Sequence, residues 1–426
     1  MSDPQVQTSI RHLISNFRPD LAPYEALYRE LHADPELSLY ESKTASTVAD
    51  LLRSLQDVEV KTIIGGEGVV GMLRNGDGPT VLLRAELDAL PIHEQTGLPF
   101  ASTKHMHGKP VMHACGHDLH MSALLASAKL LHHAREHWSG TLIFAFQPDE
   151  ENGAGAQAMV DDGLYDPQRH AVPHPDVVLG GHVMPMRAGK IATRAGAFNS
   201  TSESLRVTFF GRGAHGAKPH KSVDPVVMAS SAVLKLQTIV SREMDPMQVA
   251  VVTVGSIQAG IAANVIPDKA TLLINARSFS DDSQKMVRDS IRRIVNAESD
   301  ALGAPEPPTI ERISHFPLLF NDPKVTAAVS ESMRNYFGDD FLADIPISTG
   351  SEDISNFAIP NSAPVCFWNY GGISPKTWDD AVEKGTVEQI PANHSAKFAP
   401  EIQPTLTVAT DAYALAALTF LTLRSP

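Results

Sequence analysis

Thr80-Val81-Leu82-Leu83-Arg84-Ala85-Glu86-Leu87-Asp88 is the stretch that decides the fold of this chain. Its first residues carry apolar side chains without polar alternation, which is typical of a strand buried on both faces. The strand leads into two carboxylates, Glu86 and Asp88. Further apolar strands are predicted at 141–146 and 177–179, and helices at 23–31, 41–55 and 119–132. Such strands, separated by helices, predict an α/β fold with a helix-flanked, largely parallel sheet.

A different order of elements begins near residue 197. Strands are predicted at 204–210, 248–257, 269–277 and 309–315, and helices at 225–244 and 281–302. The order β-α-β-β-α-β is that of a ferredoxin-like module. The earlier pattern resumes after residue 317, with a strand at 365–368 and a closing helix at 406–423. We therefore predict a discontinuous larger domain, residues 1–196 and 317–426, with a smaller module inserted at 197–316.

Length and charge narrow the class of protein. A chain of 426 residues is too long for one ordinary core. Its 35 basic and 49 acidic residues give a net charge of −14, which disfavours nucleic acid as a partner. No apolar run reaches membrane-spanning length, and the polar amino terminus lacks the pattern of a signal peptide. Two cysteines make no disulfide framework, so we expect a cytoplasmic protein.

His113-Ala114-Cys115-Gly116-His117-Asp118 indicates metal chemistry. A thiolate and an imidazole two residues apart suit zinc, manganese, cobalt or nickel, whereas magnesium and calcium prefer an all-oxygen shell. Not every histidine nearby can be a ligand. His113 and His120 are expected behind the ligands or on the helix surface.

Two adjacent carboxylates, Glu150 and Glu151, follow the strand predicted at 141–146. Open α/β sheets build their sites at the carboxyl ends of such strands. Adjacent side chains point in different directions, so one carboxylate can bind a metal while the other faces a water molecule. Metal-assisted hydrolysis requires that division between a Lewis acid and a general base.

Three more residues extend this pattern. His182 ends another buried strand, and His394 lies in the loop Asn393-His394-Ser395. Asp88 is expected to orient a ligand imidazole from behind. Each feature alone has an ordinary explanation, such as a small buried cysteine, a solvated acidic turn or a core histidine. Together they indicate a metallohydrolase with two divalent ions.

The chain resembles the co-catalytic metallopeptidases of the aminoacylase and carboxypeptidase G type, and within them the branch of hippurate hydrolase and plant auxin–amino acid conjugate hydrolases. The matching runs are spread over roughly residues 25 to 425. They are 83–91, His113–Asp118, Phe146–Glu151, Gly180–Val183, Asn264–Asp268, Gly350–Asp353 and Asn393–Ser395.

This resemblance implies roles for individual residues. The five metal ligands would be Cys115, His117, Glu151, His182 and His394, with Cys115 bridging the two ions. Glu150 would be the general base and later the proton donor. The inserted module would be a lid that also forms a homodimer. The remaining implied residues are His215, which would polarise the scissile carbonyl in the partner subunit, and Asn264 and Arg277, which would bind substrate.

The expected activity is hydrolysis of N-acyl amino acids to a carboxylic acid and an amino acid. Dipeptidase or carboxypeptidase activity on small peptides is an alternative, as are a thiol hydrolase with Cys115 as nucleophile and a metal-stabilised protein without turnover. The acyl group is left open between benzoyl, acetyl, long-chain and indolyl groups, and the branch resemblance favours an aromatic or medium one. Asp149 departs from the small residue expected before the catalytic pair.

Overall fold

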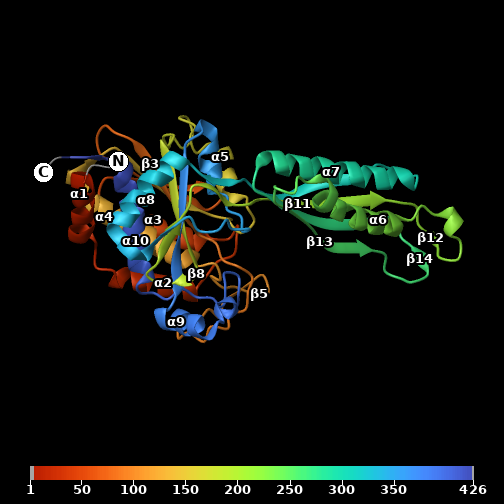
Figure 1. The fold of residues 1–426 in the computed structure, drawn as a ribbon, viewed down its shortest axis with the longest axis horizontal. Helices are drawn as coiled ribbons and strands as arrows, with labels where there is room; N and C mark the ends of the chain where they lie inside the picture. The colour runs from red at the N-terminus through yellow and green to blue at the C-terminus, as the bar shows by residue number, and fades with distance from the viewer. Residues whose placement is uncertain (1–3, 425–426) are drawn as a thin grey trace. The chain divides into compact units, whose positions relative to one another are not determined.

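The computed structural model describes residues 4–424, which divide into two compact units. The larger unit is discontinuous and holds residues up to 198, 320–346 and 353 onwards. The smaller unit holds Asn199–Leu319 and Ile347–Glu352. Figure 1 traces the chain through both.

An eight-stranded sheet lies at the centre of the larger unit, in the order β1-β2-β7-β3-β8-β19-β9-β18. Its strands are β1 (Val58–Ile64), β2 (Gly68–Arg74), β3 (Thr80–Glu86), β7 (Thr141–Gln147), β8 (Val177–Arg187), β9 (Ile191–Thr193), β18 (Phe341–Ala343) and β19 (Val365–Ile373). Strands β3, β7 and β19 are buried along nearly their whole length, which is why their sequences do not alternate.

The prediction of a largely parallel sheet was wrong in its extent. The central strands β7, β3, β8 and β19 are parallel, as are β9 and β18. However, β1 and β2 form an antiparallel hairpin, β2 pairs antiparallel with β7, and β9 pairs antiparallel with β19. The sheet is therefore mixed: β1 and β2 form a hairpin at one edge, and β9, which follows β8 after a short turn, runs antiparallel to β19 near the other.

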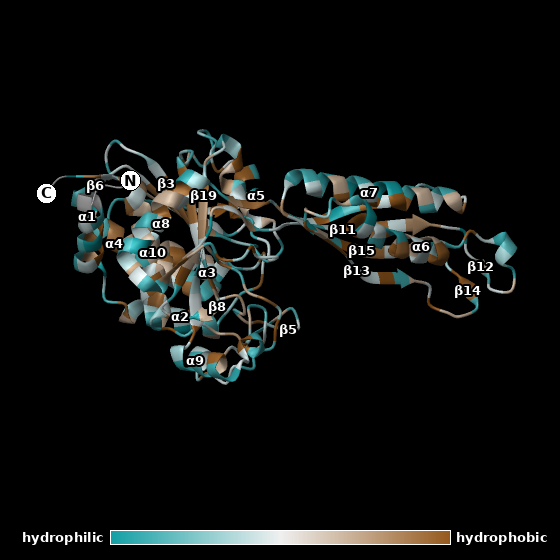
Figure 2. Ribbon diagram, viewed as in Figure 1, coloured by the Kyte–Doolittle hydropathy of each residue, from teal (hydrophilic) through white to brown (hydrophobic). Residues whose placement is uncertain are grey.

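Helices cover this sheet and complete a single apolar core. They are α1 (Pro4–Phe17), α2 (Ala22–Ala33), α3 (Ser42–Arg53), α4 (His117–His133), α5 (Gly155–Asp161), α8 (Pro323–Phe337), α9 (Pro375–Lys384) and α10 (Thr405–Phe420). Helices α4 and α10 are buried almost all round and pack against each other and the parallel strands. Figure 2 shows apolar residues concentrated along the central strands.

The smaller unit is a four-stranded antiparallel sheet with two helices and its own apolar core. In chain order its main elements are β11 (Thr201–Phe210), α6 (Pro225–Thr238), β13 (Ala250–Ala259), β15 (Lys269–Ser278), α7 (Asp281–Ala301) and β16 (Thr309–Phe316). The strand order is β13-β15-β11-β16, with β13 at one edge. The helix predicted at 225–244 changes at Ile239 into a π-helical turn.

The remaining strands are short: β4 (His105–Met106), β5 (Lys109–Pro110), β6 (Trp138–Ser139), β10 (Gly196–Asn199), β12 (Ala214–His215), β14 (Val265–Ile266), β17 (Leu319–Asn321) and β20 (Thr422–Leu423). Strands β12 and β14, which are far apart in the sequence, pair antiparallel in a small two-stranded ribbon that carries His215. Across residues 4–424, we find no helix with the length and apolar character required to cross a bilayer.

Candidate metal centre

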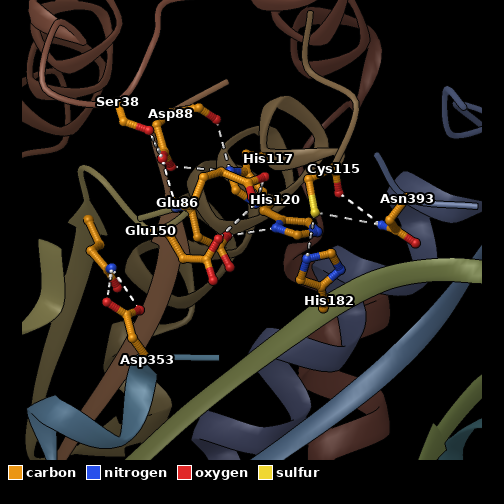
Figure 3. Close-up of polar contacts among 12 residues, drawn as sticks. Ser38, Glu86, Asp88, Cys115, His117, His120, Glu150, His182, Asp353 and Asn393 are labelled. Carbon is orange, nitrogen blue, oxygen red and sulfur yellow. Dashed lines mark hydrogen bonds and ion pairs between the residues drawn. The ribbon is translucent and has the colours of Figure 1, made fainter. Parts of the chain in front are cut away.

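Three parallel strands bring the site residues to one edge of the large sheet. In the register of β3 with β7, Glu86 lies opposite Gln147, so Asp88 and Glu150 both follow strand ends at the same edge. His182 lies on β8, which is parallel to β3 and has its carboxyl end on that side. Figure 3 shows these side chains gathered around one point.

Cys115 and His117 flank Gly116, a position that only glycine can occupy without strain. Gly116 has a left-handed backbone (φ 84°), and an added Cβ would lie 2.4 Å from Cγ1 of Val183. Helix α4 begins at His117, directly after this turn. The thiol and the imidazole are therefore held on either side of a sharp bend against β8.

The predicted ligand atoms converge. The Cys115 Sγ lies 3.4 Å from Nε2 of His182. The Nε2 of His117 lies 3.9 Å from Oε1 of Glu151, and Nε2 of His394 lies 3.3 Å from the other oxygen of Glu151. Ligand atoms of Cys115, Glu151 and His394 form one close group, and those of His117, Glu150 and Glu151 form another. Glu151 belongs to both groups.

Two of these atoms are buried without a hydrogen-bond partner among the described residues. They are Nε2 of His117 and Oε1 of Glu151, which face each other. Buried polar atoms in proteins nearly always have a hydrogen-bond partner, so two neighbouring atoms without one need an explanation. A nitrogen lone pair, a thiol and a carboxylate at this spacing fit a divalent metal ion.

Hydrogen bonds orient the imidazoles of His182 and His117. His182 donates from Nδ1 to the carbonyl oxygen of Val183 at 2.8 Å, which leaves the lone pair of Nε2 directed toward Cys115. His117 donates from Nδ1 to the carbonyl oxygen of Asp88 at 2.8 Å, which leaves its Nε2 toward Glu151. Each ring thus directs its Nε2 toward the centre, where this nitrogen can bind a metal ion once it is unprotonated.

The Asp88 side chain connects two of the predicted ligands. Its Oδ1 lies 3.3 Å from Nδ1 of His117, and its Oδ2 accepts hydrogen bonds from the Glu151 N–H at 3.0 Å and from Ser38 at 2.8 Å. Burial opposes ionisation of Asp88, but the hydrogen bond and charge of His117, together with the bonds from the Glu151 N–H and Ser38, outweigh it, so the pKa of Asp88 is lowered. This places a charged carboxylate directly behind the centre.

His120 is buried, which agrees with the expected position behind the proposed ligands and not with the alternative on the helix surface. The Val183 N–H donates to its Nε2 at 3.0 Å, which fixes the tautomer and sends the Nδ1–H to Glu86 at 2.6 Å. Glu86 is also paired with Arg84, whose guanidinium bonds Asp353 at 2.9 Å. These fully buried charges compensate one another around the site.

Several side chains that hold the proposed ligands were not predicted from the sequence. Asn393 donates from Nδ2 to the carbonyl oxygens of Cys115 and Val183, at 3.2 and 3.0 Å. Ser38 and Glu86 were not singled out either. Glu86 carried a signal, since it precedes Asp88 on the same strand face, and His120 lies one helical turn after His117. For Ser38 no local pattern exists.

The three predicted residues of the smaller unit lie as follows. His215 is exposed on β12, and its Nδ1 accepts the Ala217 N–H at 3.0 Å, which leaves the proton on Nε2. Asn264 is exposed beside it, and its carbonyl oxygen accepts the Gly216 N–H at 2.8 Å. Arg277 is half-buried on β15 and donates to the Thr349 carbonyl at 2.7 Å and to Ser351 at 3.3 Å.

Comparison with known proteins identifies the family. The model of Peptidase family M20/M25/M40 matches residues 82–393. The chain belongs to this family. It is 37% identical to the hippurate hydrolase of Campylobacter jejuni over 74% of this chain and 79% of that protein. It is 36% identical to the N-acetyl-L-cysteine deacetylase of Bacillus subtilis, over 71% of this chain and 70% of that protein.

A solved structure extends the likeness to the whole fold. The dinuclear metal binding peptidase from the M20 family of Bacillus subtilis is 27% identical, with a TM-score of 0.71 and coverage of 98% of both chains. As a member of this family, with hydrolases and deacetylases of N-acyl compounds among its relatives, the chain is an amidohydrolase. The resemblance seen in the sequence is confirmed.

Gly116→Ala should lower the stability of the fold and the affinity for metal more than a Gly→Ala change at an unconstrained position. The left-handed backbone costs about 1–2 kcal/mol for a residue with a Cβ, and the contact with Val183 adds about 1–3 kcal/mol through overpacking. Gly97→Ala is the matched control, because Gly97 is also left-handed (φ 76°) but has nothing within 4 Å of an added Cβ. Urea unfolding and calorimetric metal titration measure both variants. Equal losses of stability and metal affinity would contradict the role of Gly116.

Metal affinity should rise with pH. Burial and the charges of Glu151 and Glu150 raise the pKa of Cys115 well above its usual value, and burial raises that of Glu151 to about 7. Although burial opposes it, the bond to Asp88 raises the pKa of His117 to about 10. These groups hold protons at neutral pH and must release them to bind metal. The association constant should therefore rise at least about tenfold per pH unit between pH 6 and 8. A titration showing no proton release would contradict this.

Proposed function

We propose that this chain hydrolyses N-acyl amino acids to a carboxylic acid and an amino acid, using two divalent ions per subunit. The observation that carries the proposal is the convergence of the donor atoms of Cys115, Glu151 and His394 beside those of His117 and Glu150. Hippurate and N-acetyl-L-cysteine, named as substrates by two relatives, are both N-acyl amino acids.

The five proposed ligands are Cys115, His117, Glu151, His182 and His394. Cys115 lies near His182 and also belongs to the group of Glu151 and His394, which supports its role as a bridge. The soft thiolate and the imidazoles favour manganese, zinc, cobalt or nickel. When bound, the two ions supply a Lewis acid for the carbonyl and lower the pKa of a water molecule.

Glu150 is the proposed proton carrier. Its carboxylate is 7% exposed and one oxygen lies 3.8 Å from Nε2 of His117, so it faces the same point as the ligands. In this role, Glu150 takes the proton of the attacking water and delivers it to the leaving nitrogen of the amide. The amino acid then leaves as a neutral amine, which is the better leaving group.

The smaller unit is proposed as a ferredoxin-like lid and dimerisation domain, corresponding to the domain division at 1–196, 197–316 and 317–426. Its element order is β-α-β-β-α-β, and β13 is an edge strand with unpaired backbone groups. Exposed apolar side chains accompany this edge, among them Leu234 (74% exposed), Met247 (86%) and Ile257 (50%). These features support pairing with a second copy.

His215 would act from the partner subunit. The proton on its Nε2 is directed away from the Ala217 contact, so the ring can donate a hydrogen bond to a developing oxyanion. Asn264 lies next to it, directly before β14, and would bind the substrate. Arg277 donates hydrogen bonds to Thr349 and Ser351, so its proposed role in binding a substrate carboxylate is shared with a structural one.

A cytoplasmic location stays a prediction, supported by two buried free cysteines.

Amino acid release should depend on both metal and Glu150. Chelated protein reloaded with manganese, cobalt, nickel or zinc should release amino acid from N-benzoyl, N-acetyl, long-chain or indolyl amides, and the ranking identifies the acyl preference. Glu150→Gln should lower kcat at least about 100-fold while metal binding persists. Glu136→Gln, at an exposed position, is the control. Cleavage of dipeptides alone would favour the peptidase alternative, and no cleavage by metal-loaded protein would favour a non-catalytic relative.

Two inactive variants should restore each other if His215 acts in trans. In a mixed dimer of His215→Ala and Glu150→Gln, the site with an intact Glu150 receives the intact His215 of its partner. Random exchange of equal amounts should recover about a quarter of wild-type activity, since half of the dimers are mixed and each has one complete site. Activity measured after mixing tests this. No recovery, with exchange of subunits demonstrated, would place His215 outside the partner's site.

A further inference from the structure

Asp149 makes the turn that separates β7 from the two carboxylates of the centre. Its backbone is left-handed, with φ 52°, a conformation that residues with a Cβ rarely adopt. Aspartate tolerates it better than most residues, because its short polar side chain can bond locally. Here Asn152 donates to its Oδ1 at 2.5 Å. The directions of Glu150 and Glu151 therefore depend on an unfavourable backbone conformation.

The far side of this turn is fixed by close backbone packing. The carbonyl oxygen of Asp149 accepts the Gly155 N–H at 3.1 Å. An added Cβ at Gly155 would lie 1.6 Å from the carbonyl oxygen of Pro148, so no larger residue fits. The carbonyl side of the turn is thus bonded to the start of α5. The N–H of Asp149 is held by a different group.

Glu41 supplies that support from far along the sequence. Its Oε1 accepts the Asp149 N–H at 2.8 Å, although the residues are 108 positions apart. The side chain is completely buried, and its Oε2 has no hydrogen-bond partner among the described residues. Burial, together with the charge of Asp88, raises the pKa of Glu41 to about 8, so its carboxyl is neutral at pH 7. Burying a carboxyl with so few partners is unfavourable.

We infer that Glu41 is a positioning residue, whose carboxyl oxygen holds the left-handed turn at Asp149 and thereby aims Glu150 and Glu151 at the metal centre. This inference rests on the roles proposed above for Glu150 and Glu151. Asp88 completes the arrangement two residues further on, because it accepts the Glu151 N–H at 3.0 Å. The chain between Asp149 and Glu151 is therefore held at two backbone N–H groups by two buried carboxyls.

The test is a double-mutant cycle with metal affinity as a readout. Glu41→Ala should weaken binding of zinc or manganese about 10- to 100-fold and lower kcat more than it raises KM. Glu41→Gln keeps an acceptor oxygen and a neutral charge, so it should stay within about threefold of wild type. Adding Asp149→Gly to Glu41→Ala should recover most of the lost affinity, since glycine adopts positive φ without support.

Glu36→Ala is the matched control. Glu36 is also buried and on the same segment, but its carboxylate bonds the N–H and hydroxyl of Thr44, both at 2.8 Å. It should lower stability and leave metal affinity unchanged. If Glu41→Ala does not fold, Glu41→Met keeps the volume without the acceptor and serves in its place.

Unchanged metal affinity in Glu41→Ala, or no recovery with Asp149→Gly, would overturn the inference. Calorimetric titration needs no substrate, so these outcomes are separate from a failure of the proposed function. If the proposed function were wrong, wild-type protein would bind metal and cleave none of the amides, but the double-mutant cycle would still test the role of Glu41.

Discussion

The parallel register of β3 with β7 and β8 is the constraint on which the rest of the structure depends. It places the ends of three strands at one edge of the sheet, so that Asp88, Glu150 and His182 start from fixed backbone positions. The strands are buried on both faces and cannot slip by one residue without turning every side chain over. The rigid sheet thus fixes the backbone positions from which these side chains start, and the loops that follow the strands orient the donor atoms.

Those loops have little regular structure, so their side chains are oriented by hydrogen bonds with buried groups. Asn393 bonds the backbone of both the cysteine loop and β8, and Asp88 bonds His117 and Glu151. A second layer pairs His32 with Asp118 at 2.7 Å and with Glu94 at 3.0 Å. Although burial opposes it, these carboxylates raise the pKa of His32 to about 9. Each buried charge is stable because a partner compensates it.

The sequence predicted what local patterns encode. The central strands, most of the long helices and the order of elements in the smaller unit followed from apolar spacing. Donor atoms of the predicted ligands lie in close groups, although Cys115 and His394 come from loops and not from strand ends. The antiparallel edges were missed, since a buried strand has the same composition in either direction. The two positions expected for His120 could not be told apart from the sequence, because α4 is buried almost all round and shows no polar face. Glu41 and Ser38 act across long separations that no local pattern records.

The discontinuity of the larger unit determines when during biosynthesis the centre can form. Asn393 reaches Cys115 across 278 residues, and the entire smaller unit is translated between them. Four of the five proposed donors therefore leave the ribosome long before His394, and α10, which completes the core, follows later still. Closing so long a loop is entropically costly and slow. The nascent chain therefore carries an incomplete set of the proposed donors until residue 394 has been synthesised.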